Sequence, residues 1–311
     1  MMKKYMNQEI IYGLKSKVYY IFIALLSFMF AGILYYNFTA VENTYRKYQY
    51  YINYYKYNDL DVEAALNDTY KVQKDDSGGM TIDNPLLYSK TLLEKYIYAS
   101  SPKYALSQML ESSIILFPII FFLFGSITAT TDFKYNTNKL KTVRINKQKL
   151  NLLKQISLFL ASLIIIIISL IIGLLTSFIL YGILANEIPL ENFNISNTPA
   201  NTALGYKLIY GFVIAIVFSE LGYTLGYIFK NIVVGFCGIT IYEFILPLLG
   251  KYDLKNIWYY LGKRIFTYCG CIRIIDPLKI NIFKSVIIIV FTLVINICIN
   301  MLIAHKRSSY N

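Results

Sequence analysis

The chain has 311 residues, of which 56% are hydrophobic and only 15% are charged, so a soluble globular protein is excluded as the predicted class. A formal net charge of +12 would indicate nucleic-acid binding in a soluble domain, but here many basic residues flank long apolar runs. In that position they indicate membrane topology and contact with anionic lipid headgroups, and we expect no nucleic-acid partner. We therefore predict an all-α, multi-pass membrane protein.

The chain begins with a segment, 1–17, that has the pattern of an elbow helix lying in the membrane interface. The next segment, 18–36, is longer than the apolar part of a signal peptide and lacks a small-residue cleavage site, so we predict an uncleaved span. The apolar residues of the elbow helix recur every four positions: Met2, Met6, Ile10 and Leu14.

Residues 37–105 are predicted to form a small α+β insertion outside the cytoplasm, between the first two spans. Apolar residues spaced three or four apart over 41–55 predict that the first helix continues beyond the membrane. Two short strands flanking 75–79 predict a hairpin, and a helix over 86–98 returns the chain to the bilayer. Seven tyrosines between 45 and 57 fit either contact with peptides or lipid headgroups or a small structural cap.

Six segments are long and apolar enough to cross a hydrocarbon core of about 30 Å, which predicts a six-helix bundle with both termini on the same side. The segment 250–282 is expected outside, although its basic residues disagree with the positive-inside rule. Its short apolar pieces, 257–261 and 265–275, predict re-entrant or interfacial helices before the last span. The six predicted spans are 18–36, 106–129, 156–184, 206–229, 232–249 and 283–304.

The loop 130–155 is the most basic part of the chain, since seven Lys and Arg residues face a single carboxylate, Asp132. A loop this basic is retained in the cytoplasm, which also assigns both termini to the cytoplasmic side. Asp132 follows a polar run and is interpreted as a carboxylate at the N-terminus of a short helix near 132–143. Two readings stay open at this point: a helix that binds a cytoplasmic partner, or a loop that is merely retained.

The sequence shows no catalytic constellation. The only histidine, His305, lies among basic residues near the end and lacks partners for a metal site. A glycine-rich phosphate loop is also missing, so the chain itself is expected to bind no cofactor. Any ATP–Mg would belong to a partner subunit.

Two acidic residues within predicted spans, Glu220 and Glu243, are costly at the middle of a membrane, by roughly 3 kcal/mol each. They fit either the lining of a translocation path or carboxyl groups hydrogen-bonded between helices. Gly222 and Gly226 form a G-x-x-x-G step that favours close helix packing. Thr292, Asn296 and Asn300 form a polar stripe for which packing is also favoured, and the two asparagines are further candidates for the path.

These features resemble the permease subunits of type-2 ABC exporters over nearly the whole length of the chain. That family has an acidic residue and a basic-Ser-basic pattern in its elbow helix, matched by Glu9 and by 15–17. The following loop carries an acidic residue, a Thr, an Arg and a Lys in order, as do Asp132, Thr137, Arg144 and Lys154. The chain departs from the pattern of this family in three ways: Asp132 stands in place of the commoner Glu, no clear glycine lies beside Thr137, and the outside insertion is large.

The resemblance implies that the chain pairs with a cytoplasmic ABC ATPase subunit and with a second permease, identical or different, in a bacterial cell membrane. The ATPase would bind the short helix through Asp132, Thr137, Lys141 and Arg144. The two permeases would then export an amphipathic or hydrophobic substrate such as a peptide, antimicrobial or drug. The alternative is a membrane sensor or scaffold that transports nothing, binding an extracellular ligand and a cytoplasmic partner.

Overall fold

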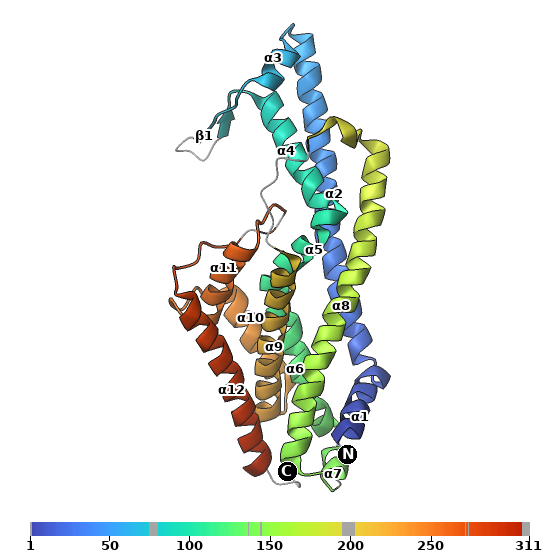
Figure 1. Ribbon diagram of the computed structural model, residues 1–311, viewed down its shortest axis with the longest axis vertical. Coiled ribbons are helices and arrows are strands. Elements are labelled where there is room, and N and C mark those ends of the chain that lie inside the picture. Colours follow the sequence, from blue (N-terminus) through green and yellow to red (C-terminus); the bar gives the residue numbers. More distant parts are fainter. Residues whose placement is uncertain are drawn as a thin grey trace.

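The computed structural model describes residues 2–74, 80–135, 137–143, 145–194, 203–270, 272 and 274–306, and this part of the chain is almost entirely helical (Figure 1). In chain order the elements are α1 (Met2–Lys15), α2 (Val18–Tyr57), α3 (Val62–Asn67), β1 (Val72–Lys74), β2 (Met80–Ile82), α4 (Pro85–Ser100), α5 (Pro102–Glu111), α6 (Ser113–Lys134), α7 (Thr137–Thr142), α8 (Lys147–Glu187), the 3-10 helix η1 (Leu190–Asn192), α9 (Leu204–Phe229), α10 (Ile232–Thr240), the π-helix η3 (Ile241–Ile245), α11 (Leu254–Ile265) and α12 (Ile282–Lys306).

Five helices of the described part are long and apolar enough to cross a bilayer: α2, α6, α8, α9 and α12. The protein is therefore an all-α, multi-pass membrane protein. The sixth expected span, 232–249, is represented by the nine residues of α10 and the five of η3. These rise at most about 21 Å, less than the roughly 30 Å of a hydrocarbon core, so a sixth full crossing stays a prediction.

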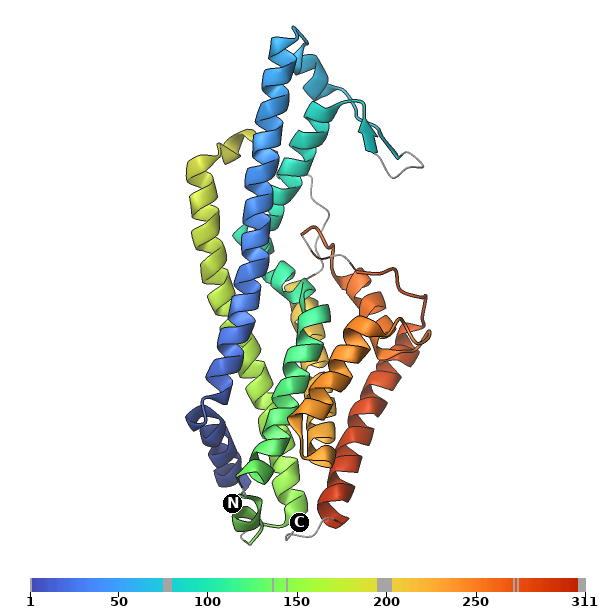
Figure 2. The ribbon, with the colours of Figure 1, turned by 180° about the vertical axis from the view of Figure 1, so that it is seen from behind.

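The two ends of the molecule differ in what they carry. The start of α1, the end of α12 and all of α7 lie at one end, which we call the terminal end, and α3 with the two strands lies at the other, the hairpin end (Figures 1 and 2). Short α11 lies on the side of α9 and α12 that faces the hairpin end (Figure 1). A partner at the terminal end would therefore meet α1 and α7 together.

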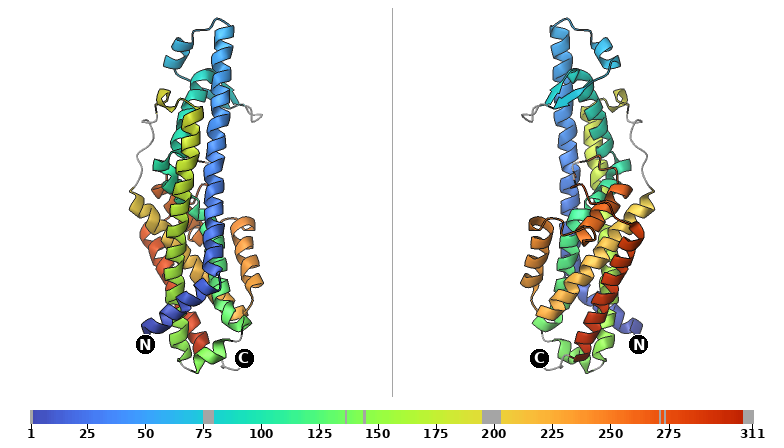
Figure 3. Two further views of the ribbon diagram at one scale, coloured as in Figure 1. Left: turned by 90° about the vertical axis from the view of Figure 1, so that its right-hand side faces the viewer. Right: turned by 90° about the vertical axis from the view of Figure 1, so that its left-hand side faces the viewer.

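Helix α2 continues without a break from the first predicted span into the predicted insertion, as the apolar spacing over 41–55 indicated. It is separated from α1 by Lys17, whose φ of 62° is left-handed. Its 40 residues span about 60 Å, and α2 runs beside α8 for much of that length (Figure 3). Towards the hairpin end a second core joins Phe38 and Val41 of α2 to Leu93 of α4 and Leu184 of α8.

The insertion contains the expected hairpin, in which β1 pairs antiparallel with β2 and Val72 lies opposite Ile82. The connection 75–79 lies outside the described residues. Helix α4 then returns towards the membrane; Pro85 starts it, and the Asn84 side chain accepts a hydrogen bond from the backbone N–H of Leu87 at 3.1 Å. An asparagine cap followed by proline is a common helix start, because the asparagine side chain pairs with a free backbone N–H group and proline has no N–H group to pair.

The predicted span 106–129 is divided and shifted. One helix, α5, ends at Glu111, and α6 begins at Ser113 and continues to Lys134. It continues through the polar run because the hydroxyls of Thr128, Thr130 and Thr131 donate to carbonyls one turn earlier, at 2.6 to 2.8 Å. The threonines are thus paired inside the helix, and the basic loop is shorter than the predicted 130–155, since α8 already begins at Lys147.

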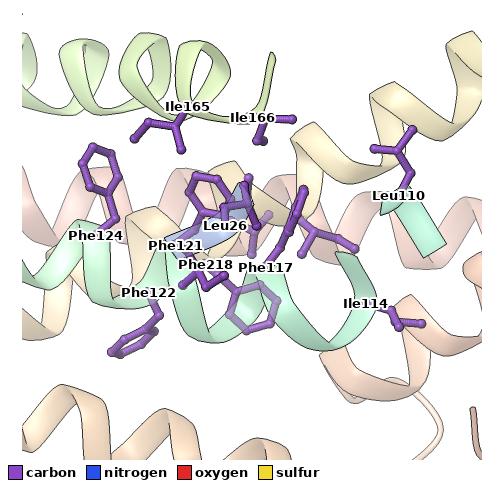
Figure 4. Close-up of a cluster of buried hydrophobic side chains, with 14 of the residues drawn as sticks. Leu26, Leu110, Ile114, Phe117, Phe121, Phe122, Phe124, Ile165, Ile166 and Phe218 are labelled. Carbon is purple, nitrogen blue, oxygen red and sulfur yellow. The ribbon is translucent and has the colours of Figure 1, made fainter. Parts of the chain in front are cut away.

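The core of the bundle is built around the aromatic face of α6. Most of its phenylalanines point towards α2, α8 and α9, where they meet branched aliphatic residues and a further phenylalanine, whereas the ring of Phe122 points the other way and faces Gly235 of α10 (Figure 4). In a bilayer, lipid tails are as apolar as these side chains, so the cluster is stabilised by close van der Waals packing rather than by removal from water. The residues in this cluster include Phe117, Phe121, Phe122 and Phe124 of α6, Leu26 of α2, Ile165 and Ile166 of α8, and Phe218 of α9.

Helices α6 and α9 touch backbone to backbone at glycines. A Cβ atom on Gly222 would lie 2.0 Å from the carbonyl oxygen of Phe122, and one on Gly125 would lie 1.9 Å from that of Ser219. Gly226 faces the backbone of Ser126, whose hydroxyl donates to the carbonyl of Gly222 at 3.0 Å. The G-x-x-x-G step thus lies against α6, and Gly125 is a third glycine in the same contact.

The prediction of re-entrant helices over 250–282 was wrong for its second half. One helix forms, α11, and the described residues between 266 and 281 contain none. Their backbone groups find side-chain partners instead: the amide of Asn256 both donates to the carbonyl of Leu278 and accepts from its N–H, at 3.2 and 2.8 Å. Because tertiary partners satisfy the chain, apolar composition alone does not make it helical.

Candidate functional site

Asp132 is the centre of a charged cluster at the terminal end. It lies in the last turn of α6 and is only 4% exposed. The interpretation of this residue as a helix N-terminal carboxylate was wrong, because α6 extends past it and α7 begins only at Thr137. A carboxylate near a helix C-terminus is disfavoured by the helix dipole, so its charge needs other partners.

Those partners come from α7 and α8. The hydroxyl of Thr137 donates to Oδ1 of Asp132 at 2.7 Å, and Nζ of Lys141 lies 3.1 Å from the same oxygen. Lys154 of α8, itself buried, forms an ion pair with Oδ2. Two lysines and one hydroxyl thus surround one carboxylate, which satisfies its oxygens and offsets the dipole of α6.

Lys141 also connects this cluster to the elbow helix. Its Nζ donates to Oε1 of Glu9 at 2.6 Å, and it lies 4.9 Å from the centre of the Tyr12 ring, a cation–π distance. Burial lowers the pKa of Lys141, but the carboxylates of Asp132 and Glu9 raise it by more, so the net pKa shift is upward. At neutral pH this lysine is therefore charged and links α1, α6 and α7.

A small cavity of about 60 Å³ adjoins the cluster. One water needs about 10–15 Å³ of such volume, so the cavity has room for a few waters and not for an amphipathic substrate. The arrangement is suited to fixing helices to one another rather than to binding cargo. Polar residues that line the cavity are Glu9, Tyr12, Ser16, Tyr19, Thr128, Thr131, Asp132, Lys141, Lys154 and Ser157.

Of the four residues expected to couple to an ATPase, three are brought together, namely Asp132, Thr137 and Lys141, while Arg144 lies outside the described residues. Glu9 and Lys154, which carried the family resemblance, join the same cluster. The chain positions of these residues span 145 places, so their meeting depends on how α1 and α8 pack beside α6.

The residues expected along a translocation path are only partly brought together. Oε1 of Glu220 accepts from the amide of Asn300 at 2.7 Å, and the same amide lies 3.0 Å from the hydroxyl of Thr224. Asn296 donates to the carbonyl of Thr292 on its own helix, at 2.7 Å. Glu243 lies in η3, and in the described part of the chain no hydrogen bond joins it to Glu220. The Glu220–Asn300 contact therefore packs α9 against α12.

Replacing Asn300 by leucine should lower the free energy of unfolding by about 1–3 kcal/mol, because Glu220 loses its hydrogen-bond partner in a buried site. Replacing both residues by leucine should recover most of that loss, since no polar group is then left unpaired. Unfolding in mixed micelles, followed by circular dichroism, measures both values. A double variant as unstable as the single one would contradict the pairing seen here.

A second polar cluster was missed from the sequence. Tyr104 of α5 donates to Oε1 of Glu111, two turns further along the same face of the same helix, and both are fully buried. Lys207 of α9, only 1% exposed, donates to the hydroxyl of Ser107 at 2.7 Å. The available signal was the spacing of Tyr104, Ser107 and Glu111, which share one helical face at intervals of three and four.

No protein-family model matches this sequence, and comparisons with curated proteins and with solved structures also returned no match. The described residues contain no group of three or more His, Cys, Asp or Glu side chains that could hold a metal ion. The geometry of the two polar clusters is therefore the basis for a functional proposal.

Proposed function

We propose that this chain is the permease subunit of an ATP-driven exporter of the type-2 ABC class in a bacterial cell membrane. A separate ATPase subunit binds ATP and Mg²⁺ and supplies the energy, and the chain moves an amphipathic or hydrophobic substrate, such as a peptide or drug, outward. Five apolar helices and a basic, short helix between two of them support this proposal.

The observation that carries the proposal is the link made by Lys141. A short helix can transmit a push from an ATPase only if it is fixed to the elements that must move. Lys141 joins α7 to Glu9 of the elbow helix and to Asp132 of α6, and Lys154 adds α8 through the same carboxylate. Force on α7 would then pass into three helices at once.

A second permease and the surrounding lipid account for the exposed apolar surface. Helices α8 and α12 expose large apolar side chains along much of their length, among them Leu175 and Phe178 of α8 and Phe291 of α12. In water such a surface would cause aggregation, whereas in a bilayer it faces acyl chains or a neighbouring transmembrane helix. A permease dimer, of identical or different chains, is part of the proposal.

Co-purification tests the proposal. An ABC ATPase should be recovered with the wild-type chain in mild detergent, and it should be lost when residues 137–142 are replaced by a Gly/Ser sequence. The matched control is Lys263→Gln, which removes an exposed ion pair to Asp276 and should retain the ATPase. Absence of any ATPase with the wild-type chain, in a preparation that stays monodisperse, would favour the sensor or scaffold function instead.

A further inference from the structure

The segment 266–270, which we call the strap, runs from the end of α11 across α5. Its backbone is held there by two side chains: the N–H of Tyr268 donates to Oε1 of Glu111 at 3.2 Å, and the N–H of Cys269 donates to Oη of Tyr104 at 3.3 Å. The hydroxyl of Thr267 lies 2.9 Å from Oη of Tyr104. Glu111 and Tyr104 therefore secure three consecutive residues of the strap.

Beneath the strap lie polar side chains whose hydrogen bonding is incomplete. Both amide atoms of Gln108 are buried without a partner, as are Oδ1 of Asn37 and Oε2 of Glu111. The strap rests directly on these amides, because a Cβ atom on Gly270 would lie 2.7 Å from Nε2 of Gln108 and 3.4 Å from Nδ2 of Asn37. Buried polar atoms without partners are unfavourable, so the closed arrangement costs free energy that hydration would recover.

The strap itself also departs from a relaxed conformation. Tyr268 has a φ of 48°, in the left-handed region that non-glycine residues rarely adopt, and its hydroxyl is buried without a partner. Strain of this kind persists only where surrounding contacts enforce it. The contacts that enforce it here are those with Glu111 and Tyr104.

We propose that the strap is a lid at the hairpin-facing end of the bundle, closed by Glu111 and Tyr104, and that its opening admits water to Gln108, Asn37 and Glu111. This inference rests on the proposed function, in which the lid is the outward exit of the translocation path. The closed state is stabilised by the hydrogen bonds to the strap, and the open state by hydration of the unpartnered amides and release of the strain at Tyr268. Such a balance makes the segment a two-state element.

Cys269 provides a native reporter, since it lies on the strap and is only 6% exposed. In a variant whose other cysteines, at 237, 271 and 298, are replaced by serine, a water-soluble maleimide should label Cys269 slowly. Adding Glu111→Ala or Tyr104→Phe should raise the labelling rate about tenfold or more, because each removes hydrogen bonds that hold the lid. The matched control is Lys263→Gln, on the neighbouring α11, which should leave the rate unchanged.

A second reporter separates lid opening from unfolding. Ala161 of α8 lies in the bundle core and is 1% exposed. A cysteine at this position, in a variant without other cysteines, should stay unreactive towards the maleimide when Glu111→Ala is also present. If Glu111→Ala makes residue 161 reactive, that variant has lost its core packing and cannot report on the lid alone. The test then rests on Tyr104→Phe, which removes only a single hydroxyl group. Unchanged labelling of Cys269 in Tyr104→Phe would overturn the lid.

The purified chain alone is sufficient for these measurements, so they do not depend on an ATPase. A separate measurement uses the chain with wild-type Glu111 and Tyr104 together with the co-purified ATPase. Adding ATP to this complex should change the labelling rate of Cys269. A lid that opens in the variants but does not respond to ATP would refute its role in transport and leave the lid itself in place. Slow, unchanged labelling in every variant would refute the lid whatever the ATPase does.

Discussion

Replacing Asp132 by alanine should lower the free energy of unfolding by about 3–5 kcal/mol, the usual cost of removing one partner from a buried ion pair. Lys141 and Lys154 would both lose their shared carboxylate, and Lys154 is buried at 7% exposure. We expect α7 to detach from α6, with faster tryptic cleavage within 137–149 and loss of the proposed ATPase. Denaturant titration and timed digestion measure the two effects.

The control for this experiment is an exposed ion pair that lies outside the charged cluster. Asp276 pairs with Lys263, but its side chain is 92% exposed, and such pairs contribute about 0–1 kcal/mol. Asp276→Ala should therefore leave both unfolding and digestion close to wild type. Equal effects of the two alanine variants would show that the buried cluster contributes no more than a surface pair.

Replacing Gly222 by leucine should be at least as damaging, since the helices α6 and α9 have no room for a side chain at their crossing. Even a Cβ atom would overlap the carbonyl of Phe122, at 2.0 Å, and a backbone cannot move aside as a flexible side chain can. Overpacking costs typically 1–3 kcal/mol, and we expect more than about 3 kcal/mol here. The unfolding midpoint in mixed micelles, and the yield of monodisperse protein, measure the effect.

Gly125→Ala, on the facing helix α6, should also lower the free energy of unfolding, because the added Cβ atom would overlap the carbonyl oxygen of Ser219. The matched control is Gly182→Ala on α8, where nothing lies within 4 Å of the added Cβ atom. That change should stabilise the helix by about 0.5–1 kcal/mol, because alanine loses less conformational entropy than glycine. If the substitutions at 125, 182 and 222 were all equally harmless, the close crossing of α6 and α9 would be excluded.

The charged cluster was partly predictable because its residues follow one another along the chain. Asp132, Thr137 and Lys141 lie within ten positions, so any short helix after α6 brings their side chains near one another. The outline of the bundle was predictable for a similar reason, since span length is fixed by the thickness of a bilayer. Glu9 was recognised only through the family resemblance, because its contact with Lys141 joins residues 132 positions apart.

The lid could not be predicted from the sequence. Thr267 and Tyr104 are separated by 163 positions, and nothing in either segment indicates the other. The apolar composition of 265–275 favoured a helix, whereas the described residues beyond Ile265 form none, because side chains of α5 accept hydrogen bonds from the backbone N–H groups of Tyr268 and Cys269. Local pattern predicts secondary structure well only where local hydrogen bonds satisfy the chain.

Helix α2 has a consequence for motion across the membrane. It is a single rod of about 60 Å whose base adjoins the elbow helix and whose tip carries Tyr57, about 30 Å beyond the length that a hydrocarbon core of roughly 30 Å would cover. A tilt of only about 5° at the base displaces the tip by ~5 Å, given the length of the rod. Small rearrangements at the terminal end are thereby magnified at the hairpin end, so spin labels near Tyr57 would register them as measurable changes in distance.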